Sequence, residues 1–124
     1  MLSVAESKNI QSELIPKIAT GFCAGIARTC AMCGAVSGAI MAINLFYGRS
    51  LPDESVETSY IRVRKLISMF ETKFGSTSCK QLTGCDLGTK EGLSTFMTNN
   101  LIEQCKNYTE EATRMAMSII EEKS

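Results

Sequence analysis

Apolar residues recur at helical spacing along the chain, and no stretch alternates polar and apolar residues for long enough to predict a strand. The clearest pattern steps by four, three, four, three and four residues over residues 56–74, and Gly75 follows as a stop signal. The same kind of stepping recurs over residues 101–119, ahead of a charged end. Each pattern predicts an amphipathic helix, and the second helix turns Cys105 inward.

Two more helices are expected in the first half of the chain. Residues 14–22 carry apolar side chains at helical spacing, and Pro16 is tolerated if it lies in the first turn. A longer stretch opens near Cys33 and runs to Tyr47, where Gly48 would supply a left-handed cap. Because this stretch is apolar on every face, we expect it to form the buried centre of a helical domain rather than a transmembrane helix.

The expected fold is therefore all-α. It consists of a single domain over residues 1–124, a helical bundle of about four main helices with a buried central helix. Residues 1–9 are polar and are expected to be frayed. Residues 77–92 are rich in Gly, Ser and Thr, which favours a short helical turn and loops.

The composition limits the chemistry that the chain can perform. Thirteen basic and thirteen acidic residues cancel, so the overall charge does not attract nucleic acid or an anionic membrane surface. Histidine is absent, which removes the usual general base and the usual imidazole ligand. Six cysteines without a secretory signal favour redox chemistry or metal binding in the cytoplasm over a scaffold of structural disulfides.

Cys30 and Cys33 stand three residues apart, where the central helix is expected to begin. Unpaired amide groups at a helix start stabilise a thiolate, and the spacing allows a reversible disulfide. The alternative is that both cysteines are small buried residues. Behind them, Gly34, Gly38 and Ala42 leave one stripe of the helix almost without side chains, which favours a neighbouring helix or, alternatively, a cofactor or substrate.

A resemblance to a known family rests on the segments "IATGFCAGIARTCAMCGAVSGAIMAINLFYGRS", "FGSTSCKQLTGCDL" and "CKNYTEEATRMAMSII". The chain resembles, over residues 15–120, the redox-active proteins that are named for a C-GCAxxG-C-C pattern. The resemblance implies that Cys33, Cys79 and Cys105 are the second, third and fourth cysteines of this pattern. It also implies that the small residues around the second cysteine, where a cofactor would bind, are Gly34, Ala35 and Gly38.

The chain departs from the family's pattern in two ways. Members carry a further helix with the first cysteine ahead of this region, and Cys23 or Cys30 is the candidate replacement here. In addition, Gly follows Cys33 instead of preceding it. A second copy of the chain can cover the surface that a missing helix leaves, so a homodimer is expected.

From these observations we expect a redox-active protein with a cysteine cluster centred on Cys33, which performs thiol–disulfide exchange or electron transfer with a redox partner protein. The candidate resolving sulfurs are those of Cys30, Cys79 and Cys105. Together with Cys33, the same thiolates are candidate ligands for zinc or an iron–sulfur cluster, and chemistry without a cofactor is the other possibility. A non-catalytic helical interaction module is a further alternative, and Cys85 receives no role.

Overall fold

The structure is a computed structural model that describes residues 1–122. In this part of the chain the regular elements are helices, and the only strand-like pairing is an isolated antiparallel bridge between Met32 and Ser78. The expected all-α class is therefore confirmed. In chain order the elements are α1 (Leu2–Ser7), α2 (Leu14–Ala19), the 3-10 helix η1 (Thr20–Phe22), α3 (Cys23–Arg28), α4 (Gly34–Tyr47), α5 (Glu57–Phe74), α6 (Cys79–Thr83), α7 (Lys90–Thr98) and α8 (Ile102–Glu121).

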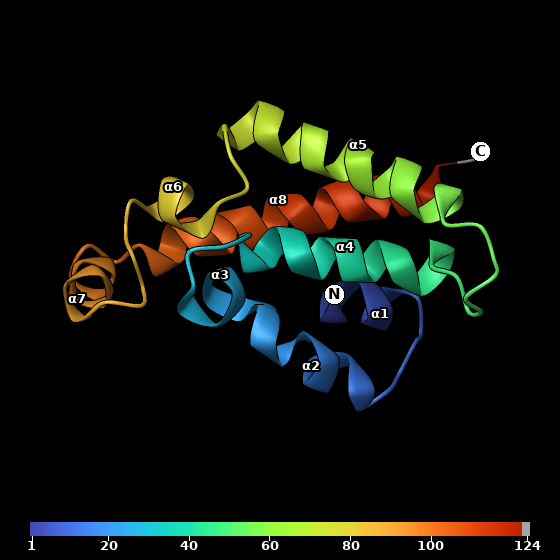
Figure 1. The fold of residues 1–124 in the computed structure, drawn as a ribbon, viewed down its shortest axis with the longest axis horizontal. Helices are drawn as coiled ribbons and strands as arrows, with labels where there is room; N and C mark the ends of the chain where they lie inside the picture. Colours follow the sequence, from blue (N-terminus) through green and yellow to red (C-terminus); the bar gives the residue numbers. More distant parts are fainter. Residues whose placement is uncertain (123–124) are drawn as a thin grey trace.

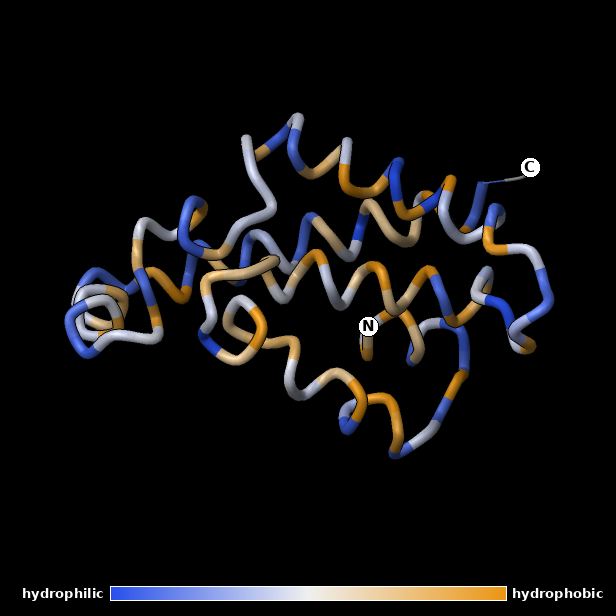
Figure 2. Tube along the Cα trace, viewed as in Figure 1, coloured by the Kyte–Doolittle hydropathy of each residue, from blue (hydrophilic) through white to orange (hydrophobic). Residues whose placement is uncertain are grey.

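Three long helices, α4, α5 and α8, lie side by side and enclose the core (Figure 1). Hydrophilic and hydrophobic segments alternate along α5 and α8, as expected for helices that bury one face (Figure 2). The expected set of four main helices differs from this arrangement, because the fourth stretch, residues 14–22, is divided between short α2 and η1. The largest side chains that are fully buried are those of Val4, Val36, Ile43, Leu66, Phe70 and Ile119.

The two amphipathic helices form almost where their periodicity predicts them. α5 ends at Gly75, which has a φ of 87° and supplies the left-handed cap. The buried face of α5 is rotated slightly from the predicted one, because Leu66 is completely buried whereas Tyr60 is exposed. The predicted apolar face of α8 is buried over most of its length, and Cys105 points inward, where it lines a cavity.

α4 begins directly after Cys33 and ends at Tyr47, as predicted. The left-handed cap that was predicted at Gly48 is wrong, because its φ is −68°. Glycine is needed there for a different reason: a Cβ would lie 2.6 Å from the carbonyl oxygen of Asn44. α4 is not buried on every face either, since its last turns expose Leu45 and Phe46.

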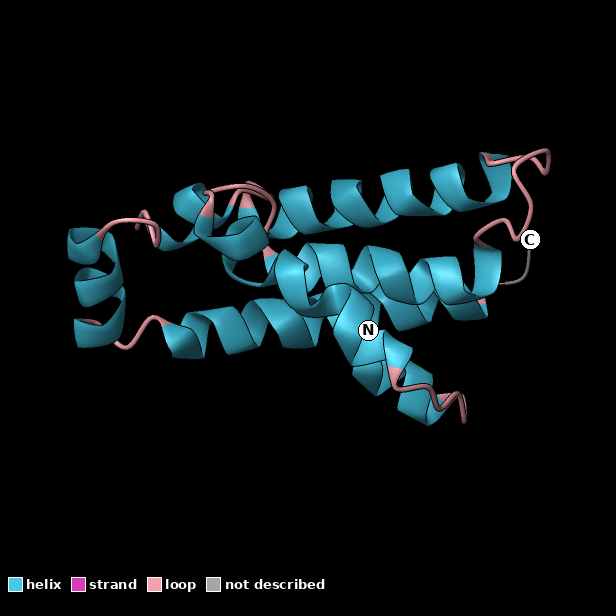
Figure 3. Cartoon of the chain, turned by 60° about the horizontal axis from the view of Figure 1, so that its bottom comes forward, coloured by secondary structure: helices cyan, strands magenta, loops and turns pink. Residues whose placement is uncertain are grey.

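The start of the chain differs from the expected frayed segment. Residues Leu2–Ser7 form α1, which packs against α4 and α8 and buries Val4 and Ala5. The helices near the N-terminus run at an angle to the three long helices (Figure 3). None of the helices within residues 1–122 combines the length and the apolar character needed to cross a membrane. The single domain over residues 1–124 and the homodimer stay predictions.

Candidate functional site

A short antiparallel pairing of the backbone brings Cys33 and Cys79 together. The amide of Cys33 donates to the carbonyl of Thr77 at 2.7 Å, and the amide of Cys79 donates to the carbonyl of Ala31 at 2.9 Å. Side chains alternate between the two faces of such a pairing. The two cysteines each follow one residue of the isolated bridge, so their side chains lie on the same face.

Four cysteines from separate parts of the chain line one cavity of about 500 Å³. Cys33 is the N-cap of α4, Cys79 is the first residue of α6, and Cys105 lies in the first turn of α8. Cys23, at the start of α3, lines the same cavity. The walls are largely apolar and include Leu87, Leu93, Phe96, Met97 and Ile102.

α3 is a left-handed turn that presses against this cavity. Residues 24–28 have φ values between 53° and 68°, a region that costs an L-residue roughly 1–2 kcal/mol. Gly25 escapes this cost and is required for a second reason. A Cβ on Gly25 would lie 2.6 Å from the Cβ of Cys79 and 3.1 Å from its Sγ. The turn therefore forms a wall that is in direct contact with Cys79.

The small residues after Cys33 lie against protein backbone as well as against the cavity. A Cβ on Gly34 would lie 3.2 Å from the carbonyl oxygen of Phe22, so at this residue the small stripe accommodates a neighbouring segment of the chain. Ala35 lines the thiol cavity, whereas Gly38 does not. The cofactor role suggested for these three residues stays a prediction.

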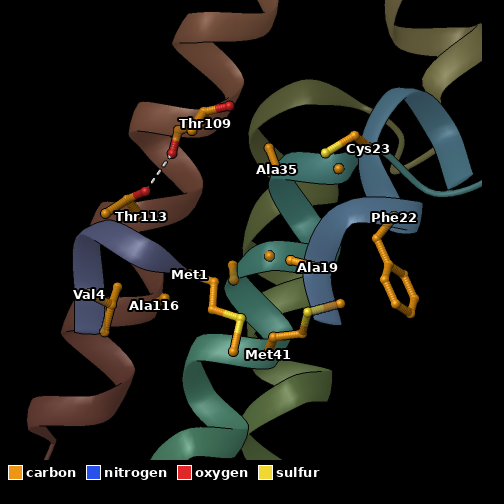
Figure 4. Close-up of a pocket in the computed structure, with 13 residues that line it drawn as sticks. Met1, Val4, Ala19, Phe22, Cys23, Ala35, Met41, Thr109, Thr113 and Ala116 are labelled. Atoms are coloured by element: carbon orange, nitrogen blue, oxygen red, sulfur yellow. Dashed lines mark hydrogen bonds between the residues drawn. The ribbon is translucent and has the colours of Figure 1, made fainter. Parts of the chain in front are cut away.

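Gly38 lines a second cavity of about 260 Å³, between the N-terminal helices, α4 and α8 (Figure 4). The two cavities adjoin, because they share the lining residues Cys23, Gly34, Ala35 and Thr109. Of the six thiols, only that of Cys23 therefore borders both spaces.

Burial opposes the ionisation that the sequence predicts for Cys33. The backbone N–H groups of Ala35 and Val36 lower the pKa of Cys33, as expected at the start of a helix. Removal of the sulfur from water is the larger effect, and the pKa of Cys33 is raised above its ordinary value. The thiol is therefore protonated at neutral pH, in contrast to the predicted thiolate.

The pKa values of Cys79 and Cys105 are raised in the same way as that of Cys33. Burial raises the pKa of Cys79, and the nearby Cys33 and Cys30 raise it further. Burial also raises the pKa of Cys105 to about 11, with smaller contributions from Cys33 and Cys79. Because a charge on one of these sulfurs disfavours a charge on the others, the three thiols act as one electrostatic group.

Cys30 and Cys85 lie outside the cavity lining. The prediction that Cys30 and Cys33 lie in one helical turn is wrong, because Cys30 precedes α4 and has a φ of 63°. Its thiol donates a hydrogen bond to Asp86, which raises the pKa of Cys30 and lowers that of Asp86. Cys85 is buried, and all six cysteines are unpaired.

The predicted metal centre is not formed. Across residues 1–122, no group of three or more Cys, Asp or Glu side chains is arranged to hold a metal ion. Among the four proposed ligands, Cys30 is turned toward Asp86 and lies outside the cavity that the other three line. The described residues therefore do not support a four-thiolate site for zinc or an iron–sulfur cluster, and the role of Cys30, Cys33, Cys79 and Cys105 as ligands stays a prediction.

Sequence reasoning assigned too little to Cys23 and nothing to Arg28, although both line the cavity. Cys23 was named only as a candidate replacement for the first cysteine of the family pattern. Arg28 carries no such signal, because its position depends on the left-handed turn.

Comparison with known proteins shows the family to which the chain belongs. Residues 1–119 match the family model described as "Putative redox-active protein (C_GCAxxG_C_C)". The match begins further toward the N-terminus than the resemblance in the sequence segments. No curated protein and no solved structure gives a significant match to the chain. With nearly its whole length matched, the chain belongs to the C_GCAxxG_C_C family of redox-active proteins.

Proposed function

We propose that the protein performs thiol–disulfide exchange in the cavity, with Cys33 as the attacking residue. The observation that carries this proposal is the convergence of Cys33, Cys79 and Cys105 on one cavity. Among these three, only Cys33 is the N-cap of a long helix, where the backbone N–H groups of Ala35 and Val36 lower its pKa and so favour its thiolate once it forms. Six unpaired cysteines suit a reducing compartment, so the proposal includes a cytoplasmic location.

The exchange has two steps that balance in electrons and protons. In the first step, the thiolate of Cys33 attacks one sulfur of a substrate disulfide, whose S–S bond breaks. The other substrate sulfur leaves as a thiolate and takes up a proton. In the second step, Cys79 or Cys105 attacks the Cys33 sulfur of this mixed disulfide. The substrate departs as a second thiol, and the protein, which has lost two electrons, retains a disulfide.

The second step requires the chain to move. Cys33 and Cys79 are diagonal neighbours across the bridge, an arrangement that typically separates the two residues by about 7–8 Å and their Cβ atoms by somewhat less. A disulfide needs a Cβ separation of about 3.5–4.5 Å. α7, which carries part of the cavity wall, packs only lightly on the rest of the fold. We therefore propose that the mixed disulfide forms faster than it is resolved.

The test is to mix the reduced protein with 2-hydroxyethyl disulfide, quench with acid, and follow the products by mass spectrometry. All variants carry Cys23→Ser, which removes the exposed thiol that also lines the cavity, and in this background Cys33→Ser should abolish the mixed disulfide of the cavity. Cys79→Ser or Cys105→Ser should leave this adduct intact, and the variant that lacks the resolving thiol should slow its resolution at least about tenfold, an effect of about 1.4 kcal/mol on the barrier.

Cys85→Ser is the matched control, because Cys85 is buried like Cys33 but does not line the cavity. This variant should react as the Cys23→Ser protein does. A Cys33→Ser protein that forms the adduct at the original rate would rule out Cys33 as the attacking residue.

A further inference from the structure

The thiol cavity adjoins a hollow at the surface that is lined by charged and polar residues as well as apolar ones. Leu87 and Leu93 line both this cavity and an adjoining surface hollow of about 450 Å³. Arg28 also borders both spaces, and the hollow continues past it to Thr89 and Lys90. A molecule that spans the two spaces would meet thiols and apolar side chains in the cavity, and the cations of Arg28 and Lys90 where the hollow adjoins it.

The two cations at the rim are free to bind an anion. Within residues 1–122, no carboxylate forms an ion pair with Arg28 or Lys90. Asp86 lies in the same region, but its carboxylate accepts hydrogen bonds from the thiol of Cys30 and the amide of Gly88. An unpaired cation beside an apolar cavity is a typical means of orienting an acidic ligand.

We propose that the cavity binds a small aliphatic disulfide that ends in a carboxylate, an inference that rests on the proposed function. The disulfide lies against Cys33, the carbon chain lies along Leu87 and Leu93, and the carboxylate faces Arg28 and Lys90. A disulfide substrate with several charged groups along its length fits less well, because the apolar walls offer few partners for buried charges.

The chemistry on such a ligand follows the two steps given above. The S–S bond of the ligand breaks, one ligand sulfur bonds to Cys33, and the other leaves as a thiolate and is protonated. Attack by a second cavity thiol on the Cys33 sulfur releases the ligand as a thiol acid. The ligand gains two electrons, and the protein gains a disulfide.

Three related probes test this inference. Lipoate is a cyclic aliphatic disulfide with a carboxylate, lipoamide is its neutral amide, and octanoate has the same carbon chain without sulfur. The reduced protein should react with lipoate about tenfold faster than with lipoamide at low probe concentration, as expected for one charge-assisted contact. Octanoate should bind by calorimetry and should compete with lipoate.

Arg28→Met should lower the rate with lipoate toward the rate with lipoamide, so that the preference for lipoate shrinks. Lys90→Met is a second variant, outside the left-handed turn, and should lower the preference for lipoate in the same direction. Arg64→Met removes the same charge from α5, away from the cavity lining, and should retain the full preference. Circular dichroism checks that each variant is folded.

The outcomes separate this inference from the proposed function. Equal rates with lipoate and lipoamide, together with no binding of octanoate, would overturn the acidic aliphatic ligand and leave thiol–disulfide exchange intact. Binding of octanoate that depends on Arg28, without any exchange with lipoate, would support the ligand class and overturn the exchange reaction.

Discussion

At the scale of single residues, the ionisation of the cavity thiols is decided by a competition between burial and hydrogen bonding. Cys33 has the backbone donors of a helix start, yet its pKa is raised because its sulfur is largely removed from water. Cys105 lacks such donors, and its pKa reaches about 11. The cavity therefore presents thiols that are protonated until a reaction partner or a higher pH removes the proton.

The pH dependence of alkylation tests these shifts. A thiol reacts through its thiolate, so alkylation of Cys105 should accelerate about tenfold per pH unit from pH 7 and level off only near its raised pKa, about 11. An ordinary thiol levels off nearer 8.5. Peptide mapping after brief treatment with iodoacetamide gives the rate for each cysteine. A plateau for Cys105 below pH 9 would contradict the effect of burial.

At the scale of elements, α3 determines how Cys79 is held. Gly25 is the residue on which the contact depends, because any side chain there would overlap Cys79 and would also have to adopt a φ of 68°. The remaining residues of the turn are not glycine, so the turn is maintained by its surroundings against their own conformational preference.

Gly25→Ala should lower the free energy of unfolding by about 2–4 kcal/mol, from the left-handed conformation and the overlap with Cys79 together. It should also change the alkylation rate of Cys79. Gly21→Ala is the matched control, because no atom lies within 4 Å of a Cβ at that position and its backbone requires no glycine. Urea unfolding gives the stability of both variants, and equal stabilities would show that Gly25 is not in tight contact.

At the scale of the whole molecule, an aromatic cluster connects the helical core to the thiol cavity. The ring of Tyr108 on α8 packs edge-on against Phe70 and Phe74 of α5, with ring centroids 6.0 and 4.8 Å away. Its hydroxyl donates a hydrogen bond to the carbonyl of Leu82 at 3.0 Å, and Leu82 belongs to α6, which begins with Cys79. Gln104 of α8 donates to the same carbonyl at 3.2 Å, so the bundle positions a cavity thiol through these two side chains.

Tyr108→Phe should lower the free energy of unfolding by about 1 kcal/mol and should increase the alkylation rate of Cys79, because α6 loses a contact with α8. Tyr47→Phe removes a comparable bond, from Tyr47 to the carbonyl of Ile120 at 2.9 Å, at a position outside the cavity lining. This control should lose similar stability without any change at Cys79. Equal alkylation rates in the two variants would mean that Tyr108 does not position α6.

Local spacing determined much of the fold. The periodicity of residues 56–74 and 101–119, together with Gly75, predicted α5 and α8 and turned Cys105 inward, because a helix buries side chains at fixed intervals whatever surrounds it. Other elements have no such signal. α1 is short, and α3 has a left-handed backbone that its sequence does not favour, so these two elements form only because other parts of the chain pack against them.

The sequence by itself determined the helical class, the start of α4 at Cys33 and the candidate thiols. Only the tertiary structure decided which of those thiols face one another: it placed Cys23, Cys79 and Cys105 with Cys33 and directed Cys30 toward Asp86. It also reversed the expected ionisation of Cys33. The physical reason is that helix periodicity and capping depend on neighbours along the chain, whereas burial, desolvation and the meeting of distant sulfurs depend on long-range packing.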